Sequence, residues 1–69
     1  MFIKVNDTIV NTDLIQYMEV KSEGPFFVNI HFNVGSTKRI KFKSLYDLND
    51  FLGKLDKEDH ISFVYANAV

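Results

Sequence analysis

Residues 25–43 read Pro-Phe-Phe-Val-Asn-Ile-His-Phe-Asn-Val-Gly-Ser-Thr-Lys-Arg-Ile-Lys-Phe-Lys, which is two alternating runs separated by a Gly-Ser-Thr break. In each run apolar and polar residues alternate, as in strands that bury one face and expose the other. The pattern predicts an antiparallel hairpin with a core side and a displayed side. The core side is Val28, Ile30, Phe32, Ile40 and Phe42, and the displayed side is Phe27, Asn29, His31, Arg39, Lys41 and Lys43.

Side-chain parity restricts the turn of this hairpin. A two-residue turn would set Phe32 opposite Arg39, and a sheet with one buried side does not tolerate such mixed faces. We therefore expect an odd loop of three or five residues around positions 35–37, or a bulge there. In that register Phe32 lies opposite Ile40 and the two faces stay separate.

The segments before the hairpin predict further strands. Residues 2–5 and 8–10 predict two short strands around a turn at Asn6-Asp7, with a single bent strand as the alternative. Residues 11–13 form a second turn-prone cluster whose side chains can bond their own backbone. Residues 14–21 alternate again, and the set without charge is expected to face inward. That set is Leu14, Gln16, Met18 and Val20. If Val20 lies opposite Val28, Tyr17 is expected to lie opposite His31.

The segments after the hairpin predict one helix and a last strand. Ser44 is a candidate N-cap with Asp47 at the third helical position, which predicts a helix over about residues 45–55. Gly53 is expected to mark a fraying point or a close approach to the sheet. Residues 60–66 predict a C-terminal strand. We expect it to pair with residues 2–5, the alternative being a free edge that invites another chain.

These elements predict the α+β class, a small and mainly antiparallel sheet of four to six strands with one helix packed on one face. The 69 residues form a single domain, 1–69. The apolar supply exceeds what one short helix can cover, so we expect an exposed apolar patch or a second covered face. No run is long enough for a membrane span and no signal peptide is recognisable, which predicts a cytoplasmic protein.

Composition and charge exclude several classes of function. There is no cysteine, so neither a disulfide nor a thiolate metal site is available. The net charge is −1, with six bases and four acids in residues 1–46 and two bases and five acids in residues 47–69. Residue usage, rich in Phe, Ile, Lys and Asn, is typical of an AT-rich coding sequence, so we expect a low-GC bacterium, or its phage or plasmid, as the source.

No arrangement of residues predicts catalysis. The two histidines, His31 and His60, lack the spacing of a metal site, and no nucleophile motif or phosphate-binding glycine loop is present. We therefore expect no catalytic residue, no cofactor and no metal, and a protein that is not an enzyme.

The displayed side of the sheet and the C-terminal strand are the surfaces on which function is expected. The candidate interaction residues are Tyr17, Phe27, Asn29, His31, Arg39, Lys41, Lys43, Phe63 and Tyr65. We expect a protein-interaction or regulatory module that binds a protein partner or itself. The alternative is weak binding of single-stranded nucleic acid, because aromatic and basic residues share the face.

Overall fold

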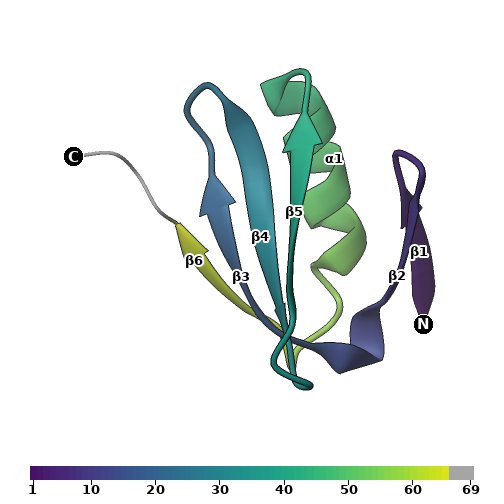
Figure 1. Ribbon diagram of the computed structural model, residues 1–69. Helices are drawn as coiled ribbons and strands as arrows, with labels where there is room; N and C mark the ends of the chain where they lie inside the picture. Colours follow the sequence, from purple (N-terminus) through teal and green to yellow (C-terminus); the bar gives the residue numbers. More distant parts are fainter. Residues whose placement is uncertain (66–69) are drawn as a thin grey trace.

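The computed structural model describes residues 1–65, which form an α+β fold (Figure 1). Within them the strands are β1 (Phe2–Val5), β2 (Thr8–Asn11), β3 (Ile15–Lys21), β4 (Phe26–Phe32), β5 (Thr37–Phe42) and β6 (Ser62–Tyr65). A 3₁₀ turn, η1 (Thr12–Leu14), precedes β3, and helix α1 spans Leu45–Leu55. The β1–β2 hairpin is one sheet, and the second has the order β5-β4-β3-β6. The predicted small, mainly antiparallel α+β fold is confirmed, with the strands divided between two sheets.

One hydrophobic cluster joins the four-stranded sheet, the helix and the hairpin. Helix α1 contributes Leu48, Phe51 and Leu55, and the hairpin contributes Val5 and Val10. Figure 1 draws α1 behind the four-stranded sheet, with the β1–β2 hairpin beside it. The hairpin therefore buries part of the apolar surface that a short helix alone leaves uncovered. The buried apolar residues of the sheet strands are Ile15, Met18, Val20, Val28, Ile30 and Ile40.

The β4–β5 hairpin has the predicted parity but not the predicted register. Its three-residue loop is centred on Val34, two positions earlier than expected. Gly35 has φ +88°, and its N–H donates to the carbonyl of Phe32 at 3.0 Å, so the glycine ends this loop in the left-handed conformation. Val28, and not Phe32, is therefore the residue opposite Ile40.

The predicted facing of β3 is correct only for its second half. Leu14 and Gln16 are exposed, while Ile15 is fully buried. The pairing of β3 with β4 shifts register between Ile15 and Tyr17, as at a bulge. The extra residue of a bulge exchanges the two faces, so Ile15 enters the core and the expected alternation applies from Met18 onward.

The predicted partner of the C-terminal strand is wrong. Strand β6 pairs parallel with β3 at the edge of the larger sheet, and not with β1. Helix α1 leads from the β5 edge to the opposite edge, so β6 arrives beside β3, while β1 belongs to the other sheet. Residue 66 of the predicted strand lies outside the described residues.

His60 precedes β6, and its Nε2 donates to the carbonyl of Thr12 at 2.9 Å.

The turns and the helix start agree with their sequence signals. Asn6 has φ +54°, and β1 and β2 pair around it as a hairpin, so the single bent strand is excluded. Asn11 accepts a hydrogen bond from the Asp13 N–H at 3.1 Å. Ser44 caps α1 by accepting the Asp47 N–H at 3.2 Å.

Gly53 lies in the interior of α1. Apart from its own helix backbone and chain neighbours, no atom of residues 1–65 lies within 4 Å of a Cβ built at this glycine, so the expected close approach to the sheet is wrong.

Candidate functional site on the outer face of the sheet

The side of the four-stranded sheet that points away from the hydrophobic cluster forms a grid of three cross-strand rows. We call it the outer face. Its rows across β3, β4 and β5 are Lys21–Phe27–Lys41, Glu19–Asn29–Arg39 and Tyr17–His31–Thr37. Six of the nine predicted interaction residues lie in this grid, and the predicted pairing of Tyr17 with His31 is confirmed. The outer face is therefore the largest group of candidate residues that the fold brings together.

His31 is fixed from three directions. The Tyr17 ring stacks on the imidazole with centroids 4.2 Å apart and planes 6° apart. Nε2 lies 2.5 Å from the Glu19 carboxylate, and Nδ1 lies 3.2 Å from the Thr37 hydroxyl. Because an ionised carboxylate only accepts, Nε2 donates to Glu19, and in the neutral ring Nδ1 accepts from Thr37. The imidazole therefore has one defined orientation on this face.

Arg39 is fixed in a similar way. Its guanidinium lies over the Phe27 ring, 4.2 Å from the centroid, and its Nε donates to Asn29 at 2.9 Å. A cation above an aromatic face is attracted by the ring quadrupole. Phe26, the residue before Phe27, packs against the core, so the two adjacent phenylalanines point to opposite faces. Aromatic, amide and cationic groups are thus held in place before any partner arrives.

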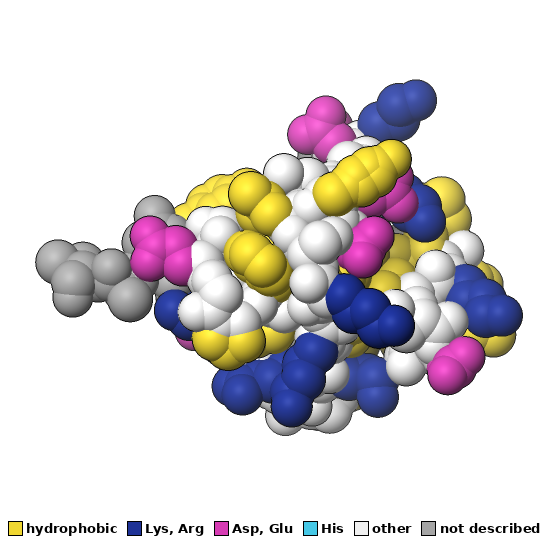
Figure 2. All heavy atoms as spheres, turned by 90° about the horizontal axis from the view of Figure 1, so that it is seen from above, with side chains coloured by type: hydrophobic (Ala, Val, Ile, Leu, Met, Phe, Trp, Pro, Cys, Tyr) yellow, Lys and Arg dark blue, Asp and Glu magenta, His cyan; other side chains and the backbone are white. Residues whose placement is uncertain are grey.

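The outer face carries a positive surplus. It holds three bases (Lys21, Arg39, Lys41) and one acid (Glu19, paired with His31), so its formal charge is +2 with neutral histidine. Figure 2 shows Lys and Arg side chains gathered at the lower edge of the view, which is the side facing the reader in Figure 1. The rest of the chain is net acidic, so the charge of the protein is divided between its two sides.

The other three predicted residues lie elsewhere. Phe63 and Tyr65 belong to β6 and pair with Met18 and Val20, so they lie on the helix side of the sheet. Lys43 follows β5 and lines a groove beside α1. Sequence reasoning did not place Thr37 on the face, because the loop was expected at that position.

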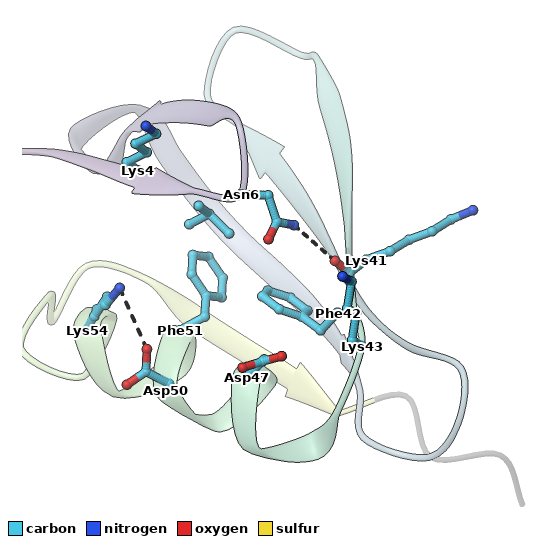
Figure 3. Close-up of a pocket in the computed structure, with 10 residues that line it drawn as sticks. Lys4, Asn6, Lys41, Phe42, Lys43, Asp47, Asp50, Phe51 and Lys54 are labelled. Carbon is cyan, nitrogen blue, oxygen red and sulfur yellow. Dashed lines mark hydrogen bonds and ion pairs between the residues drawn. The ribbon is translucent and has the colours of Figure 1, made fainter.

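A groove of about 420 Å³ lies between the β1–β2 turn, the end of β5 and α1 (Figure 3). Phe42 and Phe51 form its apolar wall, with centroids 5.4 Å apart. Asn6 closes one end by donating to the Lys41 carbonyl at 3.1 Å, while the Lys41 side chain points away from the groove. The charged residues along it have both signs: Lys4, Lys43, Asp47, Asp50 and Lys54. Because bases and acids line the groove together, its charge favours neither an anionic nor a cationic ligand.

A second, smaller groove of about 220 Å³ separates α1 from β6. Its lining residues come from the helix and from the edge strand, and they are Asn49, Leu52, Gly53, Asp56, Phe63 and Tyr65. The groove is therefore continuous with the free edge of the sheet.

Within residues 1–65, no group of three or more His, Asp or Glu side chains is placed to hold a metal ion. Among the same residues, no helix is long and apolar enough to cross a membrane.

Comparisons with protein-family models, with curated proteins and with solved structures found no match to this chain.

Proposed function

We propose that this chain is a small non-enzymatic interaction module whose outer face binds an acidic protein surface. The observation that supports the proposal is the fixed arrangement of Tyr17, His31 and Arg39 on a sheet face that no described element covers. Tyrosine and arginine are, with tryptophan, the side chains enriched at energetically important interface positions. Side chains already held in one rotamer lose little entropy on binding.

The charge of the face specifies the partner. A surface with formal charge +2 attracts an acidic patch, which accelerates encounter and suppresses basic partners. In this proposal α1 covers the inner side of the sheet, and the cytoplasm supplies the partner.

The test compares the reversal of two charges on the outer face with the reversal of one charge elsewhere. The variant Arg39→Glu/Lys41→Glu reverses the face, and Lys57→Glu changes an exposed lysine beyond the end of α1. Each protein is immobilised and used to capture partners from a cell extract of its source. We expect at least one acidic protein that binds the wild type and Lys57→Glu, is lost from the double variant, and elutes with added salt. An identical set of bound proteins on all three would contradict the proposal.

The same face carries a second candidate function, binding of single-stranded nucleic acid, because Arg39 and Lys41 flank the Phe27 ring. The ring contacts favour the protein partner, since Arg39 lies over Phe27 and Tyr17 lies on His31, which leaves less ring surface for bases. Titration with a labelled single-stranded oligonucleotide at low and at physiological salt distinguishes the two. Phosphate contacts are strongest at low salt, so absence of binding there rejects the nucleic-acid function.

A further inference from the structure

The two edges of the four-stranded sheet differ in charge. Edge strand β5 carries Lys38, Arg39 and Lys41 among its six residues, and charged side chains of this kind prevent strand-to-strand association. Edge strand β6 reads Ser-Phe-Val-Tyr and carries no charge. Within residues 1–65, β6 pairs with β3 on one side and has no strand on the other. The β6 edge therefore lacks the protection that the β5 edge has.

Apolar surface surrounds the free edge on both faces of the sheet. Val64 is 50% exposed on the outer side, and Tyr65 is 57% exposed on the helix side. The groove between α1 and β6 lies next to Tyr65, and Gly53 contributes to its wall. Glycine inside a helix costs about 1 kcal/mol relative to alanine, and no described atom lies within 4 Å of the missing Cβ. The groove beside Gly53 is therefore open, and no residue of the described chain fills it.

We propose that β6 pairs antiparallel with β6 of a second copy, so that two sheets of four strands join into one of eight. In this arrangement Val64 lies opposite Val64 of the other copy, on a two-fold axis normal to the sheet. The inner faces of both copies then lie on the same side of the joined sheet. Phe63 then lies opposite Tyr65 of the other copy. Each Tyr65 ring accordingly lies at the mouth of the groove between α1 and β6 of the other copy, beside Gly53 of that copy.

Symmetry and charge favour a second copy as the occupant. Pairing β5 with β5 would oppose like charges, and pairing β5 with β6 would leave free edges and continue into a fibre. Pairing β6 with β6 gives a closed dimer and places no charged side chain of one β6 opposite a charged side chain of the other. An interface made of a four-residue strand and one ring is below the standard size of roughly 1,600 Å², so we expect a dimer that dissociates on dilution.

Sedimentation equilibrium from about 10 μM to 1 mM tests the association. We expect the wild type to pass from monomer to dimer over this range. Val64→Lys is expected to be monomeric throughout, since two lysines would face each other, while within its own sheet the new lysine lies opposite Glu19. Ile9→Lys adds the same charge to the β1–β2 hairpin at a position that is 69% exposed, and should dimerise like the wild type. A monomeric wild type at 1 mM, or equal behaviour of the two variants, overturns the proposal.

A cysteine tests the register without depending on the stability of the lysine variant. The chain contains no cysteine, so Val64→Cys introduces a single thiol. Directly opposite residues of antiparallel strands have Cα atoms about 4.5 or 5.5 Å apart, within the range that a disulfide bridges. We expect Val64→Cys, but not Ile9→Cys, to form a covalent dimer with oxidised glutathione. Equal cross-linking of both overturns the register. Repeating the sedimentation equilibrium in 0.5 M salt distinguishes association through the β6 edge from association through the charged outer face. The apolar β6 contact should persist at this salt concentration.

Discussion

Gly35 and Gly53 occupy backbone positions with opposite requirements. Gly35 has φ +88°, a conformation that side chains with a Cβ rarely adopt. Gly53 lies in the interior of α1, and a Cβ there would meet open space. One glycine is needed for the backbone conformation of the β4–β5 loop, and the other is a cost to the helix.

We expect Gly53→Ala to raise the free energy of unfolding by about 0.5–1 kcal/mol, because alanine restricts the unfolded chain and favours the helix. Gly35→Ala should lower it by about 1–2 kcal/mol, since the new Cβ strains the left-handed conformation. Urea unfolding followed by circular dichroism measures both. A lower free energy of unfolding for the Gly53→Ala monomer would show that the added Cβ clashes with a neighbouring group.

At the scale of the element, α1 depends on its first turn. The Ser44 hydroxyl accepts the Asp47 N–H, one of four N–H groups that a helix start leaves without a partner. We expect Ser44→Ala to lower the free energy of unfolding by about 1 kcal/mol. Ser36→Ala is the control, because the bond at Ser36 uses its backbone carbonyl, which alanine retains. Thermal unfolding should show a lower melting temperature for Ser44→Ala alone, and an unchanged melting temperature for Ser44→Ala would indicate that the cap contributes nothing.

The elements themselves could be predicted because their signals are local. The bounds 45–55 and the cap at Ser44 follow from neighbouring residues, and the alternation of β4 and β5 follows from a period of two. The register of β4 with β5 could not be fixed by parity, which allows any even shift. The conformation of Gly35 selected among these registers, and the bulge between Ile15 and Tyr17 depended on packing against the core.

At the scale of the whole molecule, the β1–β2 hairpin is part of the core although it is a separate sheet. Val10 is 2% exposed and belongs to the cluster that includes Leu48 and Ile30, whereas its neighbour Ile9 is 69% exposed. In a domain of this size the hydrophobic core rarely contributes more than roughly 3–5 kcal/mol to stability, so loss of one buried side chain in the hairpin affects the entire fold.

We expect Val10→Ala to destabilise the whole protein by about 1–3 kcal/mol, since it removes two buried methyl groups and leaves a cavity. Ile9→Ala should change stability by less than about 0.5 kcal/mol. Urea unfolding should show a single transition that moves to lower urea for Val10→Ala. Loss of the hairpin alone, with the larger sheet intact, would show that the two sheets unfold independently.

The composition of the candidate site was predicted, and so was the pairing of β3 with β4 that sets Tyr17 opposite His31, whereas the pairing of β4 with β5 was not. Alternation placed Phe27, His31, Arg39 and Lys41 on one face. The contact of Arg39 with Phe27 and that of His31 with Glu19 are diagonal between neighbouring strands, so they exist only in the observed register.

The sequence by itself determined the helix with its cap, the alternating strands, and the division of the central hairpin into an apolar and a basic side, because each depends on residues close together in the chain. The tertiary structure alone decided that β6 lies beside β3, that the β1–β2 hairpin packs against the same core as α1, and which side chains of β5 meet those of β4 on the outer face. These features join segments far apart in sequence. They are set by how the whole apolar surface is buried, which no local pattern specifies.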